Sequence, residues 1–252
     1  MTITYEDILK AKETQSDVIR KTSLEFSDTF SKLCGANVYL KNEYEQKTGS
    51  FKIRGAYYKI KSLTDEEKSK GVVAASAGNH SQGVAFASQI ENIQCTIVMP
   101  KTASPAKVAA TKGYGANVVL EGITYDESWA HAQKIAKETG ATIIHAFDDP
   151  HVIAGQGVIG LEIIEELPNL DEIYVPIGGG GLVAGIITAI KEKNPNVKII
   201  GVESNAYPAM KQSLENNSLT TVEGKMTIAD GISVKTPGKF TFEIVQHKID
   251  KI

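Results

Sequence analysis

The sequence predicts an α/β protein in which parallel sheets, organised in two domains, are covered by helices. Short runs rich in β-branched residues alternate with helix-length segments along most of the chain. Such alternation is typical of parallel sheets with helices on both faces. Helix start and stop signals separate the segments, and 252 residues are enough for two small domains.

We expect seven strands, most of them separated by a helix. They are the segments 38–41, 72–75, 95–99, 117–120, 142–145, 172–177 and 197–202. The four strands between residues 72 and 145 recur about every 22 to 25 residues, so we expect these units to close on themselves as one subdomain. The flanking segments then form a second, discontinuous domain.

Local signals mark where the helices between these strands begin and end. Two capping-box pairs, one Ser-Pro start and two glycine stops are present. They are Thr64 with Glu67, Thr124 with Glu127, Ser104 with Pro105, Gly113 and Gly140.

The second domain has only three clear strands, which is few for a parallel sheet. The chain also ends on an amphipathic run, residues 240–252, that carries no helix cap. We therefore expect the sequence to be a piece of a longer protein, with the second domain incomplete at its C-terminus.

The charge balance and the cysteine and histidine spacing exclude several classes of protein. With 27 basic and 30 acidic residues spread along the chain, we expect neither a nucleic-acid partner nor a membrane partner. No apolar run approaches a membrane span, and residues 1–12 do not resemble a signal peptide, so we expect a cytoplasmic protein. Cys34, Cys95 and the five histidines show no metal-binding spacing.

The first candidate for covalent chemistry is a lysine at a predicted helix start. Lys52 ends the segment 46–52, which reads QKTGSFK. The positive end of a helix dipole favours the neutral amine, which is the form that condenses with an aldehyde. A lone lysine at such a position is usually an ordinary exposed residue, so the assignment depends on the motifs around it.

The second candidate is the segment 76–83, which reads SAGNHSQG and follows the strand at 72–75. Backbone amides at such a turn bind carboxylates or phosphates, assisted by the helix dipole. Asn79 can cap the helix and also offer its side-chain amide to a ligand. Taken alone, a plain strand-to-helix turn capped by asparagine is the simpler interpretation.

The third candidate consists of four successive glycines, Gly178, Gly179, Gly180 and Gly181, between a strand and a helix. They expose backbone N–H groups for an anion, most plausibly a phosphate. A dinucleotide fingerprint also fits well, because Gly179, Gly181 and Ala184 match G-x-G-x-x-A. Glu203, 24 residues after Gly179, stands where an acid that binds the ribose could lie. This segment alone does not separate the two interpretations.

Taken together and in this order, the motifs resemble those of fold-type II pyridoxal-phosphate enzymes, and among them the threonine dehydratases. The resemblance covers nearly the whole chain. It includes KNE at 41–43, KTGSFK at 47–52, SAGNH at 76–80, DDP at 148–150, AGQG at 154–157, the four glycines and IADG at 228–231. It implies two parallel-sheet domains of the tryptophan-synthase-β kind. The small domain would be 53–146, and the cofactor domain would be 1–52 with 147–252.

The resemblance also implies roles for single residues and no metal. Lys52 would form the imine linkage to pyridoxal 5'-phosphate, and Phe51 would border the cofactor ring. Asn79 would bond the ring hydroxyl, while the four glycines and Leu182 would hold the phosphate. The turn that contains Ser76, Asn79 and His80 would receive the substrate carboxylate on its backbone amides.

The activity implied is β-elimination of L-threonine, and also of L-serine, to 2-oxobutanoate or pyruvate plus ammonia. Lys52, once freed from the cofactor, would take the Cα proton as general base. We expect a homo-oligomer that acts on a small amino acid in amino-acid metabolism, for example in isoleucine biosynthesis.

Three alternatives stay open. Serine racemases are similar, but they carry an acid/base serine where this chain has Ala77, and of their metal carboxylates Glu203 is kept whereas Pro208 replaces a second acid. A nicotinamide-dependent dehydrogenase could use the glycine loop. A truncated cofactor domain could be non-catalytic, because this chain lacks the family's C-terminal stretch with the partner of the pyridine nitrogen.

Overall fold

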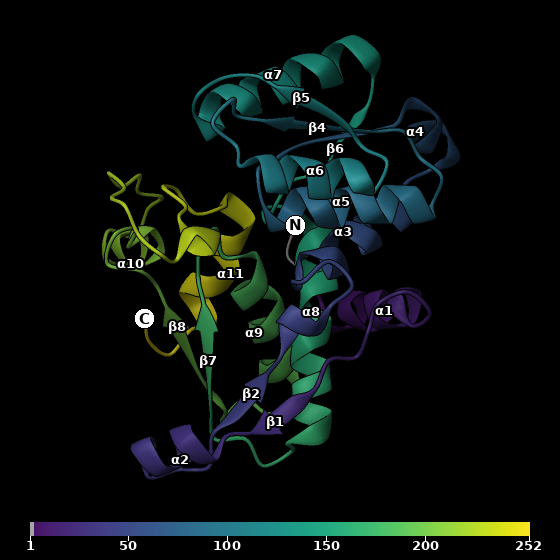
Figure 1. Ribbon diagram of the computed structural model, residues 1–252. Helices are drawn as coiled ribbons and strands as arrows, with labels where there is room; N and C mark the ends of the chain where they lie inside the picture. Colours follow the sequence, from purple (N-terminus) through teal and green to yellow (C-terminus); the bar gives the residue numbers. More distant parts are fainter. Residues whose placement is uncertain (1–2) are drawn as a thin grey trace.

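The computed structural model of the protein describes residues 3–252 as two packed units (Figure 1). The unit at the top of Figure 1 contains a four-stranded sheet, and the lower unit contains the long helices α8 (Pro150–Glu166) and α9 (Gly181–Lys193). Helix α3 (Lys52–Lys61) packs both on α5 (Asn79–Ile90) of the upper unit and on α8 of the lower one. The start of α3 is therefore held by both units.

The upper unit is a parallel β-α repeat, as the sequence predicts. Besides α5, it contains α4 (Asp65–Lys70), β3 (Val72–Ala75), β4 (Cys95–Met99), α6 (Pro105–Gly113), β5 (Asn117–Leu120), α7 (Tyr125–Thr139) and β6 (Thr142–Ile143). Its strand order is β5-β4-β3-β6, and every neighbouring pair is parallel. Strand β6 ends two residues before the predicted end at residue 145.

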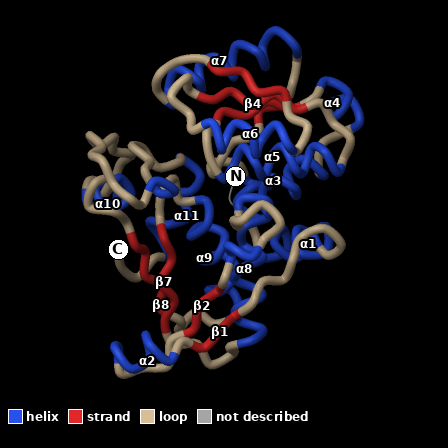
Figure 2. Tube along the Cα trace, in the orientation of Figure 1, coloured by secondary structure: helices blue, strands red, loops and turns tan. Residues whose placement is uncertain are grey.

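Alternating residues of the upper sheet pack on two different helical layers, which Figure 2 shows above and below the strands. Val73 and Ala75 of β3 pack with Ala132 of α7. Val72 and Ala74 lie in the core that includes residues of α3 and α5. Because both faces are covered, all four residues of β3 are buried, as a parallel sheet requires.

The predicted helix boundaries are largely confirmed. Both capping boxes form, and Gly140 ends α7 in the left-handed conformation. Helix α6 begins after Ser104 with proline at its first position and ends at Gly113. The Ser104 side chain, however, makes no capping hydrogen bond.

The lower unit is richer in helix than in strand. Its remaining elements are α1 (Tyr5–Gln15), β1 (Leu24–Phe26), α2 (Asp28–Cys34), β2 (Tyr39–Lys41), η1 (Glu43–Glu45), β7 (Glu172–Pro176), β8 (Lys198–Val202), α10 (Ala209–Glu215), η2 (Asp230–Ile232) and α11 (Lys239–Lys248). Strands β7 and β8 form a parallel pair. After α11 the chain begins to pair with β8, because Gly201 N–H donates to the Lys251 carbonyl at 2.8 Å.

The expectation of parallel strands throughout is wrong for the segment at 38–41. There β2 pairs with β1 antiparallel, with Leu24 opposite Lys41. The short helix α2 turns the chain back between the two strands, and such a fold-back gives an antiparallel pair. Strand β1 was not predicted, since it has three residues, none of them buried, and so lacks a clear apolar alternation.

The core of the lower unit depends on close contact between α8 and α9. A Cβ on Gly157 would lie 2.9 Å from the carbonyl oxygen of Gly185, and a Cβ on Gly160 would lie 2.9 Å from the Cβ of Ala189. The missing side chains therefore let the two backbones approach, and the surrounding aliphatic residues form one cluster with α1 and α11.

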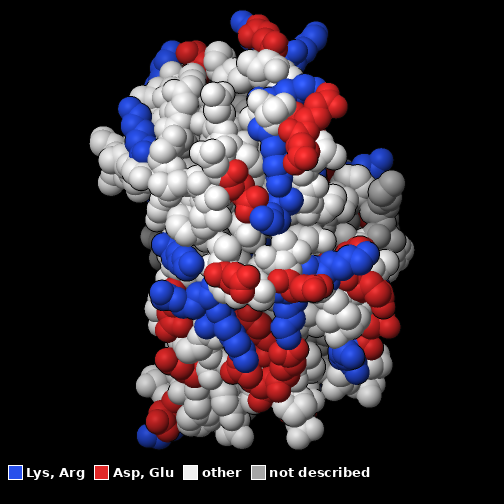
Figure 3. All heavy atoms as spheres, turned by 90° about the vertical axis from the view of Figure 1, so that its right-hand side faces the viewer, with Lys and Arg blue, Asp and Glu red and all other residues white. Residues whose placement is uncertain are grey.

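Acidic and basic side chains are interleaved on the face shown in Figure 3. Ion pairs such as Lys21 with Glu166 at 2.9 Å and Lys61 with Glu91 at 2.9 Å are typical of the molecule. No helix within residues 3–252 is both long enough and apolar enough to cross a membrane.

Candidate functional site

Lys52 is the first residue of α3, and it follows Phe51 at the N-cap position. Its side chain is half-buried, and its Nζ donates a hydrogen bond to the carbonyl oxygen of Ala146 at 2.9 Å. Burial lowers the pKa of Lys52 from 10.5 to about 8, because an ammonium group loses its hydration inside the protein. A larger fraction of this amine is therefore neutral near neutral pH than in an ordinary lysine.

Two glycines bring α3 close to its neighbours. A Cβ on Gly83 of α5 would lie 3.1 Å from the carbonyl carbon of Lys52, and a Cβ on Gly55 would lie 2.6 Å from the carbonyl oxygen of Val152 in α8. The backbone that carries Lys52 is thus pressed between two helices, which limits its freedom to move.

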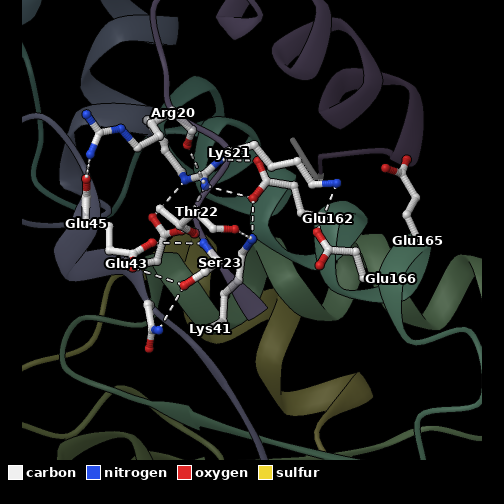
Figure 4. A network of polar contacts seen from close by, with 12 residues as sticks. Arg20, Lys21, Thr22, Ser23, Lys41, Glu43, Glu45, Glu162, Glu165 and Glu166 are labelled. Carbon is white, nitrogen blue, oxygen red and sulfur yellow. Dashed lines mark hydrogen bonds and ion pairs between the residues drawn. The ribbon is translucent and has the colours of Figure 1, made fainter. Parts of the chain in front are cut away.

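A buried group of four charges ties α3 to α8 and to the segment after β2 (Figure 4). The fully buried guanidinium of Arg54 binds both carboxylate oxygens of Glu43 at 2.8 Å, and those of Glu162 at 2.7 and 2.9 Å. Lys41 Nζ lies 2.7 Å from Glu162. We call Lys41, Glu43, Arg54 and Glu162 the charge quartet; its two cations and two anions cancel.

The predicted anion-binding turn at the start of α5 differs from expectation in its cap. Gly78, not Asn79, occupies the N-cap position, and its N–H donates to Ser76 Oγ at 3.2 Å. Asn79 is the first helical residue, so its side chain cannot cap the helix. That side chain is exposed and makes no hydrogen bond with any residue from 3 to 252, which leaves its amide available to a ligand.

His80 is buried beside this turn. Its Nε2 donates to the carbonyl oxygen of Ile144 at 2.9 Å, and its Nδ1 has no partner among the described residues. Burial, followed by the nearby charge of Lys52, lowers the pKa of His80 to about 3. The imidazole is therefore neutral at physiological pH.

The four-glycine loop joins β7 to α9, and a side chain would be crowded at each of its positions, most of all at Gly179 and Gly180. A Cβ on Gly178 would lie 3.1 Å from Ile232 Cα, and one on Gly179 would overlap the ring of Phe147. Gly180 has a φ of +95°, and a Cβ there would lie 2.7 Å from Met210 Cε. Packing and backbone conformation together therefore favour glycine.

The amides of this loop are not used by hydrogen bonds within residues 3–252, although Gly179, Gly180 and Gly181 are buried. Within the described part of the chain, the N–H groups of residues 178–183 donate to no protein acceptor. Three of them form the first turn of α9, where the helix dipole is positive. Leu182 lies half-buried in this turn. A phosphate group fits such a cradle.

Some of the sequence-predicted residues, namely Lys52, His80, Gly179 and Gly181, contact the segment between β6 and α8. Ala146 accepts the hydrogen bond from Lys52, and the next residue, Phe147, packs its ring against Gly179. His80 binds Ile144 on the same segment, and the ring of Phe51 lies 5.4 Å from Lys52 Nζ. Their assigned roles stay predictions, but one neighbourhood contains them.

Sequence reasoning gave no role to Ala146, Phe147 or Thr241, which form much of this neighbourhood. Thr241 Oγ1 donates to the carbonyl oxygen of Gly179 at 2.6 Å. The hydrogen bonds of Ala146 with Lys52 and of Thr241 with Gly179 join residues more than 60 positions apart, and no local pattern signals them.

Glu203 is committed to a structural role. Its carboxylate accepts the N–H groups of Met210 and Lys211 at 2.8 and 2.9 Å, at the start of α10. No group of three potential metal ligands occurs within residues 3–252. Because both carboxylate oxygens of Glu203 already accept backbone N–H groups, Glu203 is not free to bind a ribose, as the dinucleotide interpretation would require.

A family model described as "Pyridoxal-phosphate dependent enzyme" matches residues 15–252 of this chain. An L-threonine ammonia-lyase of Thermotoga maritima is 53% identical over 250 residues, which is 99% of this chain and 62% of the relative. The chain thus spans less than two thirds of the length of that relative.

Solved structures of two named activities share the fold. The processed form of threonine deaminase isoform 2 from Solanum lycopersicum has a TM-score of 0.95 at 42% identity, covering 98% of this chain and 72% of that one. Serine racemase from Dictyostelium discoideum has a TM-score of 0.93 at 38% identity, covering 100% and 81%. The fold therefore does not separate elimination from racemisation.

Proposed function

Because this chain belongs to the family of pyridoxal-phosphate dependent enzymes, we propose that its protein converts L-threonine to 2-oxobutanoate and ammonia. L-Serine would give pyruvate and ammonia. The observation that carries the proposal is a half-buried lysine of lowered pKa, Lys52, bound to the segment that packs on a glycine loop whose amides have no acceptor within residues 3–252. The name of the Thermotoga maritima relative supports the choice of threonine.

The residues present fit the cofactor. The amides of Gly178, Gly179, Gly180, Gly181 and Leu182 would hold its phosphate. Lys52 would attach to its aldehyde, with the Phe51 ring beside it. The Asn79 side chain, which has no partner among the described residues, would bind the ring hydroxyl. Bound pyridoxal phosphate supplies an electron sink for negative charge at the substrate Cα.

Lys52 would act twice in the reaction. Its neutral amine would hold the cofactor and, when free, would take the proton from the substrate Cα onto Nζ. The amides of Asn79 and His80 at the start of α5 would orient the substrate carboxylate, since these N–H groups have no acceptor within residues 3–252. The β-hydroxyl would then leave as water with the proton that Nζ had taken, and hydrolysis of the released unsaturated product would give the keto acid and ammonia.

Serine racemisation is the competing activity, and Ala77 is the residue that separates the two. A racemase needs an acid/base group on each face of the Cα carbanion, because one group cannot reach both. Lys52 would serve one face, and the methyl group of Ala77, on the turn before α5, cannot serve the other. We therefore propose elimination with little racemisation.

The test is an assay of L-threonine and L-serine for keto acid, run beside chiral chromatography of the serine reaction. We expect keto acid from both substrates and little D-serine, with more D-serine from Ala77→Ser. D-Serine formed by the unmodified protein at a rate that rivals keto acid would favour the racemase. We also propose that the protein is a cytoplasmic homo-oligomer, whose size light scattering would measure.

A further inference from the structure

The segment 144–149, which joins β6 to α8, contacts both Lys52 and the glycine loop of the proposed cofactor site; we call it the connector. Its Ala146 carbonyl accepts the hydrogen bond from Lys52 Nζ at 2.9 Å. The ring of Phe147 fills the space beside Gly179. The carbonyl oxygen of Phe147 lies close to Gly181, since a Cβ on Gly181 would be 2.9 Å from that oxygen. A shift of the connector would therefore move both the lysine's partner and the glycine loop.

The connector also supports the glycine loop through α11. The Asp148 carboxylate accepts the first N–H groups of that helix, from Lys239 and Phe240 at 2.9 Å and from Thr241 at 3.2 Å. Thr241 Oγ1 in turn donates to the carbonyl oxygen of Gly179 at 2.6 Å. The loop is thus held from two sides, and both supports start in the connector.

His145 fixes the turn of the connector. Its Nδ1 accepts the backbone N–H of Asp148 at 2.8 Å and that of Phe147 at 3.3 Å. Its ring packs edge-on against Trp129 and Phe147, with centroid distances of 5.2 and 4.7 Å. A ring nitrogen that accepts hydrogen bonds carries no proton, so His145 is neutral in this conformation.

We propose that His145 is a positioning residue of the cofactor site, whose Nδ1 holds the connector in the conformation that serves Lys52 and the glycine loop. The inference rests on the proposed function, because it assumes that the cofactor binds at this loop. His145 itself need not touch cofactor or substrate; its contribution is the acceptor that orders two backbone amides.

The charges around His145 favour this neutral state on balance. Burial, the largest effect, lowers the pKa of His145, and the positive charge of Lys52 lowers it further. Asp148 and Asp149 oppose this effect, and the neutral ring of His80 lies nearby. The pKa falls below the ordinary imidazole value, so the acceptor is present at neutral pH.

Three substitutions separate the acceptor from the bulk of the ring. His145→Asn can place its side-chain oxygen close to the position of Nδ1. His145→Leu keeps an apolar side chain without an acceptor. His145→Gln keeps a polar group but carries it one bond farther out. The measurement is the dissociation constant of pyridoxal phosphate, from titration of cofactor-free protein, together with amide hydrogen exchange of Phe147 and Asp148 before cofactor is added.

We expect His145→Leu and His145→Gln to weaken cofactor binding about tenfold or more, because the half-buried N–H groups of Phe147 and Asp148 would lose their acceptor. The amides of Phe147 and Asp148 should exchange faster in these variants. His145→Asn should bind within about threefold of the unmodified protein and keep the two amides protected, since the acceptor is restored.

Equal affinity in all four proteins would overturn the proposal, and so would equal weakening in all three variants. If His145→Leu does not fold, the comparison of the pyridoxal phosphate dissociation constants of His145→Gln and His145→Asn decides the question. These results are distinct from a failure of the proposed function, in which the unmodified protein itself would bind no pyridoxal phosphate or would attach it at a lysine other than Lys52.

Discussion

At the scale of single residues, burial makes Lys52 chemically unusual. Its Nζ has one protein partner, the Ala146 carbonyl, and no carboxylate forms an ion pair with it among the described residues. A half-buried ammonium that loses part of its hydration without a counter-ion is destabilised, so the neutral amine gains relative stability and the pKa falls to about 8. The same environment that costs stability supplies the reactive form.

The pH dependence of cofactor attachment follows from this shift. Only the neutral amine attacks an aldehyde, so the rate of covalent attachment to cofactor-free protein should rise with pH and level off above about 8. Stopped-flow absorbance after addition of pyridoxal phosphate measures this rate, and Lys52→Arg should show no covalent phase. A rate that keeps rising to about pH 10 would indicate an ordinary exposed lysine.

At the scale of elements, the glycine loop combines a special backbone conformation with tight packing. Gly180 has a left-handed φ of +95°, and a Cβ there would lie 2.8 Å from Thr241 Oγ1. Thr241 is also the residue that binds the Gly179 carbonyl. A side chain at position 180 would therefore disturb the loop and its support together.

Gly180→Asp should weaken the binding of pyridoxal phosphate by about 100-fold or more, because strain of order 1–3 kcal/mol adds to charge repulsion of the phosphate. Equilibrium titration of cofactor-free protein measures the change. Gly113→Ala is the matched control, since a Cβ there meets nothing within 4 Å. Unchanged affinity in Gly180→Asp would mean that the phosphate binds elsewhere.

Helix α3 depends on a second kind of support, the charge quartet. Arg54, two residues after Lys52, is fully buried and has carboxylates on both sides. Two cations and two anions leave no net charge, but removing one partner would leave a buried charge without compensation.

Glu162→Gln should lower the free energy of unfolding by about 3 kcal/mol, because Lys41 would lose its carboxylate partner and Arg54 would keep only Glu43. Urea denaturation followed by circular dichroism measures the loss. The control is Glu138→Gln, whose partner Lys134 forms an exposed pair; there we expect a change within about 0.5 kcal/mol. Equal effects of the two substitutions would show that the quartet does not stabilise α3.

At the scale of the whole molecule, local signals predict what depends on neighbours in sequence. The upper sheet is predictable because its strands follow one another through capped helices, as at Thr64 and Thr124. The glycine loop stands out in the sequence because helix packing alone rarely requires four successive glycines, whereas an anion cradle does.

What the sequence does not reveal depends on contacts between distant segments. The antiparallel pairing of β1 with β2 uses short strands without apolar alternation. The sequence predicts a strand that continues to His145, at the start of the connector, although the strand stops at Ile143. Asparagine favours the cap position, which predicts Asn79 as the cap of α5, but Gly78 adopts it.

The most direct test of the central claim is to identify the lysine that holds the cofactor. Borohydride reduction of the cofactor-loaded protein fixes pyridoxal phosphate to its lysine, and mass spectrometry of the peptides locates it. We predict a single modified site, Lys52, and no modification in Lys52→Ala. Modification of any other lysine in the unmodified protein, with Lys52 free, would contradict the account.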